Sequence, residues 1–151
     1  MLFYVYILVI YCYVVEKAEN SSTILNNNKN RTIIYKTIFE NGNLAEISFE
    51  CDSLPNLDND NIKCTSIIYS FYDNGNLKEK GCQGIYNGYG VPVGAWYHYD
   101  LEKNLTTKTY YHNDEFGKDY ILIEYYKNGT IEKTEKYNNY ILYETEKKLL
   151  K

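Results

Sequence analysis

The chain has 151 residues and a formal net charge of -4, and 24% of its side chains are charged. This length supports one domain rather than two. A mildly acidic chain lacks the clustered Lys and Arg that a phosphate backbone needs, so we expect no nucleic-acid partner. Tyrosine is the unusual component, with 19 Tyr against 5 Phe and 1 Trp. Because a Tyr ring packs on a pleated surface while its hydroxyl stays in water, this composition favours β-sheet.

The chain opens with an uncharged apolar run, residues 1–15, which ends abruptly at two charged side chains. The run is shorter than the roughly 20 residues that a membrane-spanning helix needs, and it matches the core of a signal peptide. We therefore predict a signal peptide or membrane-anchor helix over residues 1–16, with Cys12 as the candidate for lipidation. The protein would then be exported from a bacterium, as a periplasmic, membrane-anchored or secreted protein. The alternative is that this run is a buried strand or helix of the fold itself.

The rest of the chain divides by composition. Residues 17–31 are polar and are predicted to form a linker. Residues 32–146 carry the alternating aromatic and aliphatic pattern of strands, so we predict one β domain there. Residues 147–151 form a charged tail.

The chain contains four cysteines, Cys12, Cys51, Cys64 and Cys82. Cys51 and Cys64 bracket a stretch of turn-forming residues. In an exported chain we expect a Cys51–Cys64 disulfide, which would contribute about 3 kcal/mol through loop entropy. Four reduced thiols remain the alternative, because the pairing cannot be read from sequence. No Cys-x-x-Cys pair occurs, and we expect neither a metal site nor a cofactor.

A repeat is the most informative feature of the sequence. Four segments place an aromatic residue before a turn and an aliphatic residue after it: residues 39–44, 72–77, 99–105 and 126–131. Tyr72, Tyr99 and Tyr126 follow one another at intervals of 27 residues, and Phe39 precedes Tyr72 by 33. Such periodicity is typical of stacked supersecondary units.

Three of these segments contain Asn-Gly at matched positions, namely Asn41-Gly42, Asn74-Gly75 and Asn128-Gly129. Asn-Gly between two strand-like runs indicates a β-hairpin with a type I′ turn, in which both central residues have positive φ. Residues 99–105 lack the Gly and are one residue longer, so we expect a longer loop there. The predicted fold is all-β: an antiparallel meander of repeated hairpins that forms a largely single-layer sheet.

Between residues 71 and 105 the pattern is aromatic, Asn-Gly, Leu, Gly, Tyr-x-x-Gly, then Gly-x-Trp-x-x-Tyr. The positions that carry it are Tyr72, Gly75, Leu77, Gly81, Tyr86, Asn87, Gly88, Gly94, Trp96 and Tyr99. This stretch resembles the MORN-repeat variant of bacterial proteins, and only the hairpin half of the resemblance persists at residues 34–50 and 120–137. Such proteins are often grouped as an antitoxin family of the YwqK type. The resemblance therefore implies a MORN-like fold and an antitoxin or immunity role through binding of a toxin.

The sequence shows no nucleophile paired with a base at motif spacing. His98 lies in a predicted strand and His112 in the segment 110–114, and neither has Ser or Cys at such a spacing. We interpret both as surface or edge histidines. We therefore expect no catalytic residue and no enzymatic activity.

An aromatic strip is the remaining candidate surface for a protein partner such as a toxin or surface protein. Its members are Tyr69, Trp96, Tyr97, Tyr99, Tyr110, Tyr111, Tyr125 and Tyr126. We favour the interpretation that these rings pack on one another across strands and stabilise a thin sheet, because such a sheet has little other core. Two functions follow: a protein-interaction module of antitoxin, immunity or surface-assembly type, or a cell-wall or carbohydrate-binding repeat protein.

Overall fold

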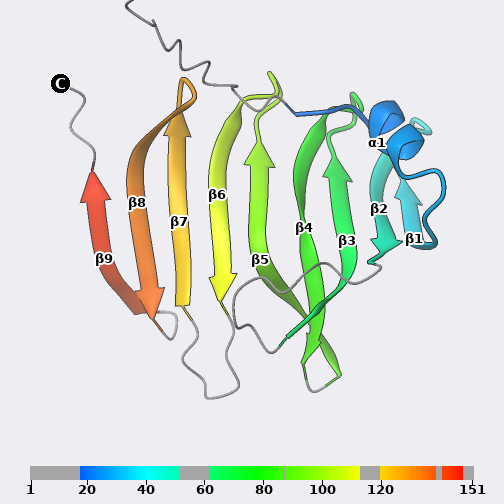
Figure 1. Cartoon of the computed structure of the whole chain (residues 1–151). Helices are drawn as coiled ribbons and strands as arrows, with labels where there is room; N and C mark the ends of the chain where they lie inside the picture. Colours follow the sequence, from blue (N-terminus) through cyan, green and yellow to red (C-terminus); the bar gives the residue numbers. More distant parts are fainter. Residues whose placement is uncertain (1–17, 52–61, 87, 113–119, 139–140, 148–151) are drawn as a thin grey trace, which may run out of the picture.

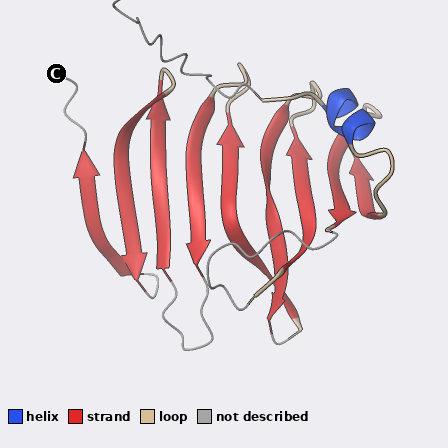
Figure 2. Cartoon of the chain, in the orientation of Figure 1, coloured by secondary structure: helices blue, strands red, loops and turns tan. Residues whose placement is uncertain are grey.

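The structure is a computed structural model that describes residues 18–51, 62–86, 88–112, 120–138 and 141–147. Its nine described strands form one antiparallel sheet, in which every strand pairs with its neighbours in sequence (Figures 1 and 2). The elements are α1 Ser21–Asn27, β1 Ile33–Ile38, β2 Leu44–Glu50, β3 Cys64–Phe71, β4 Leu77–Tyr86, β5 Tyr89–Tyr99, β6 Leu105–His112, β7 Tyr120–Lys127, β8 Thr130–Asn138 and β9 Ile141–Lys147. The prediction of an all-β antiparallel meander is confirmed. The predicted signal or anchor segment, with Cys12, and residues 148–151 of the tail lie outside the described residues.

The predicted linker over residues 17–31 is wrong in its described part, because residues 18–28 are an integral part of the fold. Asn20 caps α1, since its Oδ1 accepts a hydrogen bond of 2.9 Å from the backbone N–H of Thr23. Ala18 and Ile24 are buried in the hydrophobic core. A helix of seven residues is marginal alone in water, so burial of Ile24 against the sheet is what stabilises it.

The core lies between α1 and one face of the sheet. Its buried members are Ala18, Ile24, Leu44, Ile47, Phe49, Phe71, Leu77 and Tyr99, with Leu25, Tyr69, Tyr97 and Leu105 packed around them. Figure 1 places α1 at the upper end of the first strands. Apolar burial is therefore concentrated in the first half of the sheet.

The first three turns share one geometry. In the first, Gly42 N–H donates to Phe39 O at 2.9 Å and Phe39 N–H donates to Asn43 O at 2.8 Å. The same two bonds recur from Tyr72 to Asn76 and from Asp100 to Asn104. Only the last of the three loop residues has positive φ: Gly42 at 83°, Gly75 at 81° and Lys103 at 69°. This is a three-residue loop ending in a glycine-type bulge, not a type I′ turn.

Two turn predictions are therefore wrong. Asn41 and Asn74 do not adopt positive φ, because their side-chain oxygens instead accept the backbone N–H two residues later, each at 2.9 Å. The third loop is no longer than the others, because Lys103 takes the left-handed position that Gly occupies elsewhere. Asp100, rather than Tyr99, is thus the structural counterpart of Tyr72.

The fourth turn does match the prediction. Asn128 and Gly129 have φ of 52° and 76°, and Lys127 pairs directly with Thr130. A two-residue loop with two positive φ values is a type I′ turn. The same Asn-Gly dipeptide therefore adopts two turn types in this chain.

Neighbouring turns are tied by asparagine side chains. Asn43 Nδ2 donates to Asp73 O at 2.6 Å, and Asn76 Nδ2 donates to the equivalent oxygen of the next turn, that of Leu101, at 3.1 Å. The segment before α1 crosses the same turns, because Ala18 N–H donates to Lys103 O at 3.2 Å. These bonds hold the first three turns in a row at one end of the sheet.

The register defines two faces. Residues directly opposite each other on paired strands share a face. Tyr69, Lys80, Tyr97, Lys108 and Glu124 lie opposite one another in succession on the face that α1 covers, which we call the helix face. Ser70, Glu79, His98, Thr107 and Tyr125 succeed one another on the other side, which we call the opposite face.

Candidate functional site

The predicted aromatic strip does not form one surface. Tyr69, Tyr97, Tyr110 and Tyr126 lie on the helix face, and Tyr99 on that side is buried in the core. Trp96, Tyr111 and Tyr125 lie on the opposite face. Side chains alternate between the faces along a strand, so consecutive aromatic residues such as Tyr110 and Tyr111 point in opposite directions.

On the helix face, one lysine lies over the rings of two tyrosines from neighbouring strands. Lys108 Nζ lies 5.3 Å from the ring centroid of Tyr97 and 4.6 Å from that of Tyr110. Tyr126 donates its hydroxyl to Glu124 Oε2 at 2.8 Å, and burial together with this bond raises the pKa of Tyr126. These half-buried rings are therefore held by cation–π and hydrogen-bond contacts within the sheet.

On the opposite face, the aromatic residues are also engaged within the sheet. Trp96 and Tyr111 meet edge to face, with ring centroids 6.4 Å apart. Tyr125 donates its hydroxyl to Glu135 Oε2 at 2.8 Å, and burial followed by this bond raises the pKa of Tyr125 to about 12. Lys133 also pairs with Glu135. Cross-strand packing, the alternative reading of the aromatic residues, thus accounts for much of their placement.

A polar network crosses five strands on the opposite face, from Tyr35 through Glu46, Ser70 and Glu79 to His98. Ser70 Oγ lies 3.3 Å from Glu46 Oε2 and 3.4 Å from Glu79 Oε1. Its single hydroxyl proton can be donated to only one of these two carboxylates at a time. His98 Nδ1 is 3.1 Å from Glu79 Oε2, and this contact lowers the pKa of Glu79, while burial opposes the shift.

The order of groups in this network matters chemically. Glu79 stands between Ser70 and His98, whereas a nucleophilic serine needs the imidazole in direct contact. We interpret the arrangement as a hydrogen-bond network that links neighbouring strands. Within the described residues no cluster of His, Cys, Asp and Glu is arranged to hold a metal ion.

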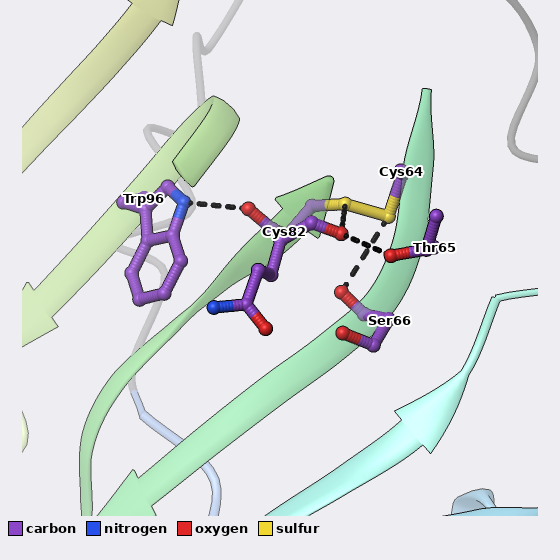
Figure 3. The surroundings of a disulfide bond; sticks show 6 residues. Cys64, Thr65, Ser66, Cys82 and Trp96 are labelled. Carbon is purple, nitrogen blue, oxygen red and sulfur yellow. Dashed lines mark hydrogen bonds between the residues drawn. A yellow bond between two sulfur atoms is a disulfide. The ribbon is translucent and has the colours of Figure 1, made fainter. Parts of the chain in front are cut away.

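The predicted Cys51–Cys64 disulfide is wrong. Cys64 is bonded to Cys82, 18 residues further on, with the two Cα atoms 5.6 Å apart (Figure 3). Cys51 is a free thiol. Sequence reasoning placed the bridge across the intervening loop, whereas the sheet pairs β3 with β4 and sets Cys64 beside that strand. The bridge therefore joins adjacent strands.

Cys82 marks the point where the β4–β5 hairpin leaves the rest of the sheet. Trp96 Nε1 donates to Cys82 O at 2.9 Å, so β4 is fixed here by the disulfide and by the indole (Figure 3). Beyond this point β4 pairs with β3 only as far as Gly84, and β5 pairs with β6 only from Gly94 onward. Figure 1 shows this hairpin reaching further than the neighbouring strands.

The end of this hairpin is apolar and exposed. We define the hairpin tip as Ile85, Gly88, Tyr89 and Gly90; the side chain of Ile85 is 61% exposed and that of Tyr89 is 76% exposed. Ile85 lies opposite Gly90, which has no side chain to cover it. Neither Ile85 nor Tyr89 was among the candidate residues predicted from the sequence. The signal that marks them is the stretch from Gly81 to Tyr99, which is free of Asp, Glu, Lys and Arg.

Comparison with known proteins found no match: no family model, no curated protein and no solved structure is similar to this chain. No helix among the described residues is long and apolar enough to span a membrane.

Proposed function

We propose that this chain is a non-enzymatic protein-interaction module, and that the hairpin tip inserts into an uncharged, apolar cleft of a partner protein. The observation that carries the proposal is the exposure of Ile85 and Tyr89 at the end of a hairpin that is uncharged from Gly81 to Tyr99. A few well-exposed aromatic and aliphatic anchors supply most of the affinity of many protein interfaces. The lack of charged side chains around the hairpin tip fits a cleft that would exclude charged side chains.

The contacts that hold the base of the hairpin favour its insertion into a partner. Its base is held by the Cys64–Cys82 disulfide and by the Trp96 hydrogen bond to Cys82. A partner would therefore meet a hairpin whose base is already fixed, and preorganisation lowers the entropic cost of binding. Pro92 has no amide proton, so this part of β5 is a poor template for strand addition. Insertion of side chains is the better mode.

The orientation of the hairpin also favours a partner that lies away from Ala18, the first residue that the structure describes. β5 runs from Tyr89 at the tip to Tyr99, which precedes the turn where Lys103 O binds Ala18. Eleven strand residues span about 36 Å at roughly 3.3 Å per residue. If residues 1–16 anchor the protein in a membrane, the tip would lie well away from the anchoring point. An immunity or surface-assembly role, as the MORN-like resemblance implies, is consistent with this arrangement.

The experiment combines site-specific cross-linking with binding measurements. A photoreactive phenylalanine analogue replaces Tyr89 and, as the control, the exposed Lys127 at the other end of the sheet. A protein cross-linked only through position 89 is identified and purified, and its affinity is measured for the wild type, for the Ile85→Ser/Tyr89→Ser variant and for Lys127→Ser. We expect the tip variant to bind at least tenfold more weakly and the control to bind normally. Equal affinity for all three chains would refute the proposal.

The cell-wall or carbohydrate alternative rests on the tyrosines of the helix face. Tyr97, Tyr110 and Tyr126 present half-buried rings on three neighbouring strands, and sugars stack on such rings. Retention on peptidoglycan or a choline resin that is lost in a Tyr97→Ala/Tyr110→Ala variant, but kept in the tip variant, would support this function instead.

A further inference from the structure

β1 is an edge strand with little protection from water. All six of its residues are exposed, and its large apolar side chains include Ile33 at 49%, Ile34 at 54% and Ile38 at 62%. The neighbouring strand β2 buries Ile47 and Phe49 almost completely. Isolated exposed apolar residues are common, but several along one edge strand mark a contact surface.

The backbone of β1 is available on its outer side. β1 pairs with β2, and it is the first strand of the sheet order, so no other described strand lies beside it. An edge of this kind is a template for pairing with another strand. The far edge, β9, differs in sequence: ILYETEK carries charged residues at three of its last four positions, which is typical of edges that resist pairing.

We propose that β1 pairs antiparallel with β1 of a second copy of this chain, forming a two-fold symmetric dimer with one continuous sheet. The charges flanking β1 favour this direction. Lys29 and Arg31 precede the strand and Glu40 follows it. Antiparallel pairing brings the basic end of one strand to the acidic end of the other, whereas parallel pairing would align like charges.

The same symmetry selects the register. A two-fold axis perpendicular to the sheet keeps every residue on its own face, so the strands must meet with some residue opposite its own copy. Centring the axis on Lys36 would place two ammonium groups side by side, which is unfavourable. Centring it on Tyr35 brings the two tyrosines together and sets Lys36 opposite Ile34 of the second copy. The aliphatic stem of Lys36 can then cover that isoleucine.

The pairing is expected to be limited in strength. The register between β1 and β2 shifts between Ile33 and Tyr35, and such a bulge bends an edge and shortens its regular part. The charge of Lys36 within the strand also weakens pairing with a second strand. We therefore expect reversible dimerisation that depends on concentration rather than a permanent dimer.

Sedimentation or light scattering of the full chain from about 1 to 100 µM provides the first test. We expect a shift from monomer to dimer mass. Ile34→Lys sets a lysine opposite Lys36 of the second copy, so its dissociation constant should rise at least tenfold. Ile85→Lys is the matched control, because it makes the same change at an equally exposed isoleucine far from β1, and it should dimerise normally. A chain that stays monomeric, or one that dimerises equally well with Ile34→Lys, would overturn the proposal.

The second test reports the register directly. In a Cys12→Ser/Cys51→Ser background, Tyr35→Cys should form an intermolecular disulfide under mild oxidation, because residues on the two-fold axis lie opposite each other at bonding distance. Ile85→Cys should not. Association through the apolar residues 1–15 would produce no such selectivity. Equal cross-linking at both positions would refute β1 pairing and leave the hairpin-tip proposal untouched, since that proposal rests on different residues.

Discussion

The indole of Trp96 lies directly against the backbone of Gly81, so that a Cβ at position 81 would overlap the ring. Trp96 is on β5 and Gly81 on β4, and the indole covers Gly81 on the opposite face, next to Cys82 in sequence. The absence of a side chain at Gly81 is what allows Trp96 to reach Cys82 O. The base of the projecting hairpin therefore depends on this pair.

Gly81→Ala should lower the free energy of unfolding by about 1–3 kcal/mol, the usual cost of overpacking. Urea denaturation measures this loss. Gly90→Ala is the matched control in β5, because a Cβ there would meet only the side chain of Gln83, which can turn aside. Similar losses for the two variants would contradict the close packing of Trp96 on Gly81.

Lys103→Gly should stabilise the protein. Lys103 occupies the left-handed region with φ of 69°, which costs an L-residue roughly 1–2 kcal/mol, while glycine loses somewhat more chain entropy on folding. The expected net gain is about 0.5–1 kcal/mol, seen as a higher denaturation midpoint at unchanged slope. The reverse change, Gly75→Lys, should be destabilising by a similar amount or more. A loss of stability in Lys103→Gly would show that the third turn differs from the first two.

The disulfide gives a prediction that distinguishes the Cys64–Cys82 bond of the structure from the Cys51–Cys64 bond predicted from the sequence. Peptide mapping under non-reducing conditions should recover Cys64 linked to Cys82 and Cys51 as the alkylatable thiol. Breaking a loop of this length by Cys82→Ser should destabilise the oxidised protein by about 3 kcal/mol. Cys51→Ser should change the stability little under the same conditions. Recovery of a Cys51–Cys64 peptide from the native protein would refute the assigned bond.

Acid should weaken the fold partly through Glu79. The hydrogen bond with His98 lowers the pKa of Glu79 in the folded state, so the unfolded chain takes up a proton first as the pH falls. The stability from this carboxylate is present above its unfolded pKa of about 4.3 and is lost as the pH falls through the lower folded value. Glu79→Gln should therefore show a shallower loss of stability below about pH 4.3 than the wild type.

The matched control for this acid dependence is Glu40→Gln, a change at an exposed carboxylate in the first turn. It should retain the slope of the wild type. Two-dimensional NMR of the Glu79 side chain gives its pKa directly. An unchanged slope in Glu79→Gln would contradict the role assigned to this network.

Several elements follow from local sequence alone. The Asn128-Gly129 turn and the strands around it were predictable, because two residues with positive φ flanked by alternating apolar residues leave the chain few other conformations. The remaining Asn-Gly pairs located hairpins but not their turn type. The side-chain oxygens of Asn41 and Asn74 stabilise a competing loop, and the dipeptide itself does not reveal which loop prevails.

The sequence by itself determined the all-β antiparallel meander, because alternation, aromatic content and turn residues are local properties that each strand carries with it. Only the tertiary structure decided the rest. The strand register places neighbouring tyrosines on opposite faces, so the predicted aromatic strip is divided between the two faces of the sheet. Because β3 pairs with β4, Cys64 lies beside Cys82 and forms its disulfide with that residue. Burial of Ile24 stabilises a helix in a segment whose sequence is mostly polar. Each of these outcomes depends on contacts between residues distant in sequence, which local pattern cannot rank.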